Sequence, residues 1–274
     1  MRQWHTILQK VLRHGTYRKD RTGVGTMAVF AESLKFQNTS TFPAVTTKHL
    51  AFKQAAGEMA CFIRGNHSLD AFHAFGCGVW DGNGNDPKWT NSEGPQFEGD
   101  LGRIYGVQWR DWKRPGKESV DQLHELISGL QTNPCGRRHL VTAWNPGELD
   151  QMCLPPCPVM WQVYRSEQRI DLCVYQRSCD LFLGLPFDIA GYALLQRLIA
   201  KELGCRSGEL TFFIGDAHIY MNHVDAVKCV LKRDPNKGPM LLIDPAASLF
   251  DFHPSQVKMV DYNPHPPVPA LLNV

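Results

Sequence analysis

Segments with strand-like alternation and segments with helical periodicity follow one another along the chain in no regular order. Alternation or short apolar runs predict strands over residues 26–37, 139–145, 159–165, 170–178, 210–220 and 240–244. Apolar residues three and four positions apart predict helices over 4–15, 51–65, 120–133 and 220–233, and after Asp188. Strands and helices mixed without strict alternation predict an α+β fold.

Size and charge limit what such a fold can bind. The 274 residues are 43% hydrophobic, which suffices for a large core, and we expect a single domain over 1–274. The Gly- and Asn-rich stretch 81–100 is typical of a surface loop or insertion rather than a domain linker. A net charge of +2 argues against a dedicated nucleic-acid or membrane surface, so an anionic ligand would be bound locally.

The nine cysteines favour a reducing compartment. They form no Cys-x-x-Cys pair, and neither a signal peptide nor a transmembrane run is recognisable, so the expected location is the cytoplasm. Cys153 and Cys157 stand four apart without further ligands at zinc-like spacing, so we expect no metal site.

Asp188 stands directly before an apolar series with helical spacing, namely Ile189, Tyr192, Leu195, Ile199 and Leu203. This local pattern predicts that Asp188 caps the N-terminus of the helix. Asparagine caps a helix about equally well, so capping alone does not explain why an aspartate stands here.

Cys157 follows two prolines in "LPPC" and leads into a predicted strand. A cysteine is most often a small buried hydrophobe, whereas a nucleophilic one needs nearby positive charge to stabilise its thiolate. Candidate arginines are Arg21, Arg137, Arg138 and Arg177. Each alone is typical of a solvated surface charge. Several together would form an anion site, because guanidinium groups suit the oxygens of a phosphate.

Three further polar residues leave two interpretations open. Alternation places His218 and Tyr220 on one face of a strand end, where they could bind a sugar hydroxyl or simply pack as a polar pair. Glu58 lies within an otherwise apolar helical segment, so it is either exposed on the polar face or placed for proton transfer.

Together these motifs resemble the thymidylate synthase family over nearly the whole chain. The matching segments are "DRTGVGT", "FPAVTTK", "LGRIYGVQWRDW", "GRRHLVTAWNPGELD", "LPPC", "YQRSCDLFLGLPFDIAGYALL", "GDAHIYMNH" and "YNPHPPV". The resemblance implies a three-layer α/β fold around a large bent mixed sheet with flanking helices, and a homodimer with sheets packed back to back. It also implies one-carbon transfer from 5,10-methylenetetrahydrofolate to C5 of a pyrimidine nucleotide.

The same resemblance implies roles for individual residues. The Cys157 thiolate would add to C6 of the base, Glu58 would organise water and proton transfer, and Tyr105 would assist removal of the C5 proton. Substrate binding would fall to Arg21, Arg177, Ser178, His218 and Tyr220, with Arg137 and Arg138 lent by the partner subunit. Folate binding would fall to Trp80, Leu154, Asp180, Gly184, Phe187 and Val274.

Two departures from the family pattern point to cytosine. Where the family has an asparagine that pairs with uracil, this chain has Asp188, whose carboxylate suits the N4 amino group and a protonated N3. The family's "PCH" is here "PCP", so Pro158 replaces a histidine of the hydrogen-bond network around O4 of uracil. The chain therefore resembles the deoxycytidylate hydroxymethylases and methylases with which bacteriophages modify their DNA, and we predict dCMP as the substrate.

The product depends on whether water reaches the exocyclic methylene of the intermediate. Asn83, where the family usually has a tryptophan that anchors the closed C-terminal tail, and the unfamiliar "KHLAFKQ" favour hydration to 5-hydroxymethyl-dCMP. Trp80, Leu154, Phe187 and the full-length tail favour the methyl product. Further alternatives are CMP as substrate, dUMP as substrate, and a non-catalytic RNA-binding member, against which the near-neutral charge and the intact Cys157 and arginines count.

Overall fold

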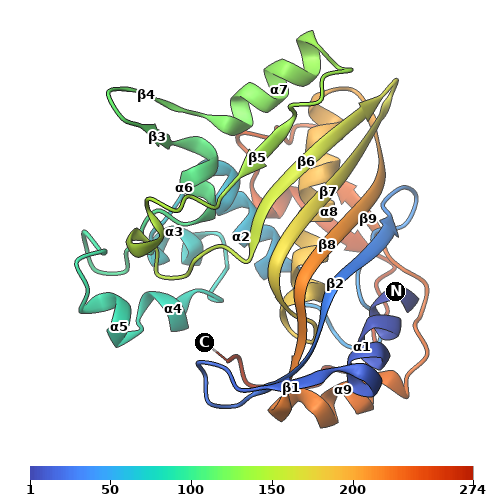
Figure 1. The fold of residues 1–274 in the computed structure, drawn as a ribbon. Coiled ribbons are helices and arrows are strands. Elements are labelled where there is room, and N and C mark those ends of the chain that lie inside the picture. Colours follow the sequence, from blue (N-terminus) through green and yellow to red (C-terminus); the bar gives the residue numbers. More distant parts are fainter. Residues whose placement is uncertain (274) are drawn as a thin grey trace.

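The computed structural model describes residues 1–273. Its centre is a six-stranded mixed sheet in the order β1 (Thr16–Arg18), β2 (Thr26–Gln37), β8 (Arg206–Tyr220), β7 (Arg169–Asp180), β6 (Pro158–Ser166) and β5 (Leu140–Thr142). The β7–β8 pair is parallel and the other pairs are antiparallel. The long strands bend, and helices flank the sheet (Figure 1). The predicted α+β class with a large mixed sheet is confirmed.

The longest helix, α8 (Gly184–Glu202), packs against β7, β8 and α2 (Phe52–Arg64). It is apolar on nearly every side, which is the pattern of a helix buried in the core of a protein. By contrast, α1 (Arg2–His14) buries one stripe, Trp4, Ile7, Leu8 and Val11, against the rest of the core. These helices cover the inner face of the sheet and complete the core.

The remaining elements surround this core. They are α3 (Leu69–Ala74), α4 (Asp81–Gly84), α5 (Pro87–Thr90), α6 (Tyr105–Arg110), β3 (Trp112–Arg114), β4 (Lys117–Val120), α7 (Gln122–Thr132), η1 (Leu149–Gln151), η2 (Met221–His223), α9 (Val224–Leu231), β9 (Met240–Ile243), η3 (Pro254–Gln256) and β10 (Val257–Val260). The predicted strand 240–244 forms β9, which pairs with β10 in a separate two-stranded sheet.

The stretch 81–100 is more ordered than the surface loop its composition predicts. It contains α4 and α5, and the buried Trp89 donates from Nε1 to the Asp100 carbonyl at 2.7 Å. One buried aromatic side chain therefore ties a Gly- and Asn-rich segment to the core, while most of the segment stays at the surface, as the prediction of a surface loop or insertion requires.

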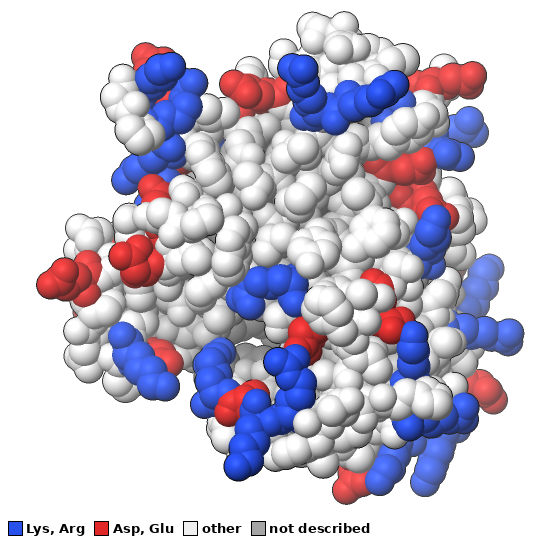
Figure 2. All heavy atoms as spheres, viewed as in Figure 1, with Lys and Arg blue, Asp and Glu red and all other residues white. Residues whose placement is uncertain are grey.

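The outer face of the sheet carries exposed aromatic side chains. Phe30 on β2, Tyr164 on β6, Tyr175 on β7 and Phe213 on β8 are 76%, 63%, 42% and 46% exposed. Charged side chains are sparse over the middle of this face, which is a broad white area in Figure 2. A weakly charged surface that exposes several aromatic side chains is typical of a protein interface.

Candidate active site

A cavity of about 1310 Å³ opens where β7 and β8 end and β6 begins. Because β7 and β8 are parallel and β6 is antiparallel to β7, the C-termini of β7 and β8 and the N-terminus of β6 lie at the same end of the strands. In Figure 2 a hollow ringed by Lys and Arg side chains is visible in the lower half of the molecule. The predicted site residues that line the cavity are Arg21, Glu58, Trp80, Tyr105, Leu154, Cys157, Arg177, Ser178, Asp180, Gly184, Phe187, Asp188, His218 and Tyr220.

Cys157 enters the cavity from the segment immediately before β6. Its backbone N–H donates to the Tyr105 hydroxyl at 2.8 Å, and its carbonyl accepts from the Arg177 N–H at 2.9 Å. Gly102 lets this segment approach α6 closely, because an added Cβ would lie 2.1 Å from the Gln151 carbonyl oxygen and φ is +73°. Neighbouring strands and α6 thus fix the thiol in place.

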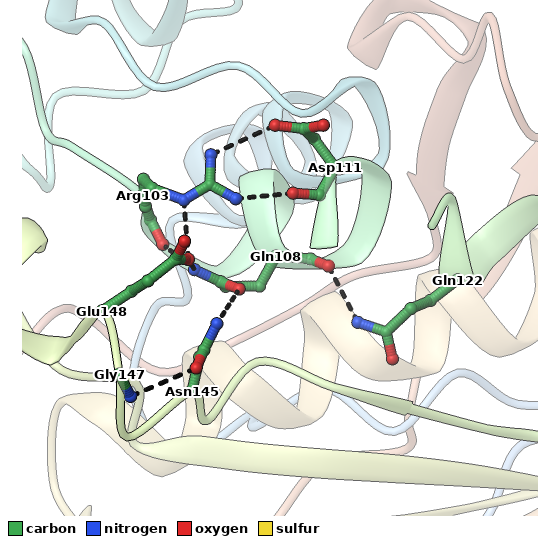
Figure 3. Close-up of polar contacts among 7 residues, drawn as sticks. All are labelled: Arg103, Gln108, Asp111, Gln122, Asn145, Gly147 and Glu148. Atoms are coloured by element: carbon green, nitrogen blue, oxygen red, sulfur yellow. Dashed lines mark hydrogen bonds and ion pairs between the residues drawn. The ribbon is translucent and has the colours of Figure 1, made fainter. Parts of the chain in front are cut away.

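A polar network behind this segment links α6 to the chain that leads to Cys157 (Figure 3). Glu148 Oε2 accepts from Arg103 Nε at 2.6 Å and from Gln108 Nε2 at 2.8 Å. Arg103 Nη1 also donates to Asp111 at 3.1 Å, and Asn145 Nδ2 donates to Gln108 Oε1 at 3.4 Å. Burial alone would raise the pKa of Glu148, but the bonds from Arg103 and Gln108 hold it below its usual value. The carboxylate therefore stays ionised and keeps the network closed.

Opposing influences act on the Cys157 thiol. Burial raises its pKa and the Asp188 carboxylate raises it further, whereas Arg177 and Arg21 act in the opposite direction. The pKa of Cys157 is raised on balance. Loss of negative charge on Asp188 would therefore favour the thiolate.

Arg177 is held rigidly. Its Nε and Nη2 donate to the carbonyls of Pro156 and Pro155, both at 2.8 Å, and its guanidinium lies 5.2 Å from the centre of the Trp144 ring. The two prolines before Cys157 thus present their carbonyls to an arginine at the cavity wall.

Arg137 and Arg138 do not reach this cavity within one chain. Both are exposed and line a second cavity of about 940 Å³, together with residues of α7 and β5. A complete four-arginine anion site is therefore not formed by a single subunit.

Asp188 does not cap α8, and that prediction was wrong. The helix begins at Gly184, four residues earlier, and its N-cap residue is Leu183. Pro186 is compatible with this start because it occupies the third helical position, where the backbone N–H has no partner within the helix. Asp188 instead lies on the cavity wall, in the second turn.

The Asp188 carboxyl is held from the sheet. Gln176 Nε2 donates to Asp188 Oδ2 at 2.7 Å, and Gln176 pairs across the strands with Pro158. Burial raises the pKa of Asp188 to about 7, and the nearby Asp180 adds to this effect. The two departures from the family pattern therefore lie together around Gln176.

Glu58 lies on α2 and faces the cavity. Its Oε1 accepts from Trp80 Nε1 at 2.8 Å. Burial raises the pKa of Glu58 to about 8, with Asp188 contributing in the same direction. This raised pKa favours the protonated form near neutral pH, and Glu58 does not lie on an exposed polar face. Its part in proton transfer stays a prediction.

His218 and Tyr220 lie side by side, as alternation predicts. Their ring centres are 5.1 Å apart and their ring planes are nearly perpendicular. His218 Nδ1 donates to Asp216 Oδ1 at 3.0 Å. His218 can therefore present Nε2 and Tyr220 its hydroxyl to a ligand in the cavity.

The cavity wall also combines aromatic, aliphatic and acidic groups. Trp80, Leu154, Gly184 and Phe187 line it, and Asp180 Oδ1 accepts from the Phe182 and Leu183 backbone N–H groups at 2.8 and 3.3 Å. Asn83 also lines the cavity. Val274 lies outside the described residues.

Sequence reasoning missed several residues of this cavity. Gln176 and Trp144 line it. Lys48, from the segment "KHLAFKQ", and most of the C-terminal segment 267–273 line it as well. Gln176 alternates with Ser178 and Asp180 along one strand, which was a usable signal.

The thymidylate synthase family model matches residues 2–274. The chain belongs to the thymidylate synthase family. Members of the thymidylate synthase family carry out folate-dependent one-carbon transfer to pyrimidine nucleotides, typically as homodimers, and this chain is accordingly a one-carbon transferase.

Residues 1–273 contain no group of three or more His, Cys, Asp or Glu side chains that could hold a metal ion. Within the same residues, none of the helices is long and apolar enough to cross a membrane.

Proposed function

We propose that the protein transfers the one-carbon unit to C5 of dCMP and yields 5-hydroxymethyl-dCMP. The observation that carries this proposal is the Asp188 carboxyl on the cavity wall, held by Gln176 next to Pro158. Membership of the family supports folate-dependent one-carbon transfer to a pyrimidine nucleotide. Asp188 and Pro158 distinguish the substrate.

Asp188 would read the edge of the cytosine ring. One carboxyl oxygen accepts from Gln176, which leaves the other for the N4 amino group of the base. Its pKa of about 7 lets Asp188 share a proton with N3. When the Cys157 thiolate adds to C6, electron density moves toward N3, so a proton held there stabilises the adduct more than the free base.

Uracil would be rejected by the same groups. Its O4 is an acceptor and would face the Asp188 carboxylate, and Pro158 supplies no side-chain donor to O4. An unmatched polar contact in a buried site can change specificity by a factor of about 10⁴.

The folate would occupy the part of the cavity lined by Trp80, Leu154, Asp180, Gly184 and Phe187. A volume of about 1310 Å³ exceeds the range of roughly 300–1,000 Å³ for one small ligand, so the residues present fit a nucleotide together with a folate. When bound, the folate supplies the one-carbon unit and, in a methylating enzyme, also the hydride. The protein's part is to orient both ligands and to control water.

Proton handling would fall to Glu58 and Tyr105. Glu58 is protonated near neutral pH and can exchange protons with an ordered water, while Tyr105 bonds the Cys157 backbone and its hydroxyl lies beside the base site. Removal of the C5 proton and regeneration of the thiol would depend on these two side chains.

The phosphate would be bound by Arg21, Arg177 and Ser178, with Arg137 and Arg138 coming from the partner subunit. The exposed aromatic face of the sheet supports a homodimer, as does the position of Arg137 and Arg138 away from the Cys157 cavity of their own chain. A C₂ dimer through this face would bring Arg137 and Arg138 of each subunit toward the Cys157 cavity of the other subunit.

Subunit mixing tests the shared site. The variants Arg137→Ala and Cys157→Ser, each inactive alone, should regain about a quarter of wild-type activity after subunit exchange, because half of the dimers are hybrids with one intact site. The steady-state rate, with exchange followed by native mass spectrometry, gives the result.

The matched control mixes Cys157→Ser with Arg177→Ala, whose defects both fall in the cavity of their own subunit. This pair should stay inactive after exchange. Complementation by both pairs, or by neither, would contradict the assignment of Arg137 to the partner's site.

Asn83 supports the hydroxymethyl product. It stands where the family usually has a tryptophan, so water should reach the exocyclic methylene before reduction. Turnover of dCMP should then produce no dihydrofolate absorbance, whereas Asn83→Trp should raise the methylated fraction, measured by mass spectrometry.

One observation favours the methyl product as a second candidate. Pro267, Val268, Pro269, Ala270, Leu272 and Asn273 already line the cavity, which limits access of water. One dihydrofolate per dCMP consumed, with a methylated nucleotide, would establish this alternative and overturn the hydroxymethyl proposal. The cytosine assignment would stand in either case.

A further inference from the structure

The last residues of the chain reach the cavity along a fixed path. Tyr262 OH donates to the Val45 carbonyl at 2.9 Å, the His265 N–H donates to the Thr46 carbonyl at 2.7 Å, and Arg233 Nη1 donates to the Pro266 carbonyl at 2.7 Å. Residues 267–273, here called the tail, continue from this point along the cavity. The tail therefore depends on other contacts to stay in place.

Those contacts are concentrated at η2. His223 Nε2 bonds the Leu271 carbonyl at 2.7 Å and lies 3.2 Å from Asn273 Nδ2. Asn222 and Asn273 exchange two side-chain bonds of 3.0 and 3.2 Å. Of these groups only His223 is fully buried, so its bond to Leu271 is shielded from water.

The second ring nitrogen of His223 faces an acid. Nδ1 is buried, has no hydrogen-bond partner among the described residues, and lies 3.8 Å from Asp180 Oδ1. Because a carbonyl can only accept, the bond to Leu271 requires the hydrogen on Nε2. In neutral histidine the Nδ1 lone pair would then oppose the Asp180 carboxylate, whereas in imidazolium both nitrogens donate.

We propose that His223 is the anchor of the tail: as an imidazolium it holds Leu271 over the cavity and couples the tail to the charge of Asp180. His223 is thus a positioning residue, because it acts on the cavity through the tail. Asp180 also lines the cavity, so any ligand that changes the charge around Asp180 would change how firmly the tail is held.

The surroundings of His223 agree with a charged ring. Burial by itself lowers the pKa of His223, but the Asp180 carboxylate and the Leu271 carbonyl outweigh burial and the opposing charge of Lys48, and the pKa is raised overall. Phe182 and Tyr220 complete the packing, with ring centres 5.6 and 5.5 Å away. Since the raised pKa belongs to the docked state, docking is favoured at low pH and weakens as pH rises through that pKa.

Hydrogen exchange of the ligand-free protein tests the anchor independently of the proposed substrate. In His223→Leu the tail amides should exchange about tenfold faster or more, with the amides of β7 and β8 unchanged. In the wild type, protection factors of the tail, corrected for intrinsic rates, should fall as pH rises above about 6.5 and through the raised pKa of His223. In His223→Gln, which keeps an N–H donor but carries no charge, they should be lower at the acidic end and independent of pH.

His139→Gln is the matched control, because His139 is also buried and bonds a backbone carbonyl, that of Asn133, at 2.9 Å. This variant should leave tail protection unchanged. Equal tail protection in His223→Leu and wild type would overturn the proposal. So would pH-independent protection in the wild type, a result that requires no variant to fold.

Discussion

Replacing Cys157 with serine is expected to abolish turnover while leaving nucleotide binding largely intact. The expected loss in kcat is at least about 10⁴-fold, because removal of a covalent nucleophile leaves only binding and electrostatic stabilisation. Binding should persist because the polar groups proposed for the phosphate and sugar come from other segments, such as Arg177 and His218. Single-turnover kinetics and calorimetric titration with dCMP measure the two quantities.

Cys153→Ser is the matched control. Cys153 lines the same cavity four residues earlier, but burial raises the pKa of its thiol to about 12, which disfavours a thiolate. This variant should keep most of its activity. The reverse pattern, in which Cys153→Ser is inactive and Cys157→Ser is active, would show that Cys153 and not Cys157 is the nucleophile.

The second large effect is expected from Asp188→Asn. The amide can pair with N3–H and O4 of uracil but matches cytosine poorly, so the ratio of kcat/KM for dCMP to that for dUMP should fall by about 10² to 10⁴. The absence of a side-chain donor at Pro158 limits the gain toward dUMP. A ratio that stays at the wild-type value would refute base recognition by Asp188.

The pH profile gives an independent check on Asp188. Because the pKa of Asp188 is raised to about 7, the shared proton is lost as pH rises, and kcat/KM for dCMP should decline above about pH 7. Asp188→Asn removes this contribution and also removes a negative charge that raises the pKa of Cys157, so the thiol should react with alkylating reagents at lower pH.

Asp171→Asn provides the matched control for both measurements. Asp171 lies at the other end of β7, where it accepts from the Glu209 N–H at 2.7 Å and pairs with Arg169. Its replacement makes the same chemical change without altering the cavity, so the substrate ratio and the alkylation profile should stay as in the wild type.

Local pattern predicted much of the fold. The strand 26–37 coincides with β2, and the helices predicted at 51–65 and 120–133 correspond to α2 and α7 within a few residues. Gly65 explains the sharp end of α2, because its φ of +72° suits the left-handed cap that glycine favours. These elements have strong periodicity and terminal signals of their own.

The errors arose where contacts distant in sequence override local pattern. The apolar series after Asp188 suggested a helix start there, yet α8 begins at Gly184, and Pro186 is tolerated in its first turn. Trp89 orders a stretch whose composition is typical of a loop. Gln176 meets Asp188 only because β7 lies beside α8, and neither residue marks the other in the sequence.

A competition between dCMP and dUMP distinguishes the two substrates. The purified protein is given equal amounts of dCMP and dUMP with 5,10-methylenetetrahydrofolate, and mass spectrometry identifies the nucleotides that gain mass. We expect dCMP to gain one CH₂O unit while dUMP is left unchanged. Conversion of dUMP to dTMP with dCMP untouched would contradict it.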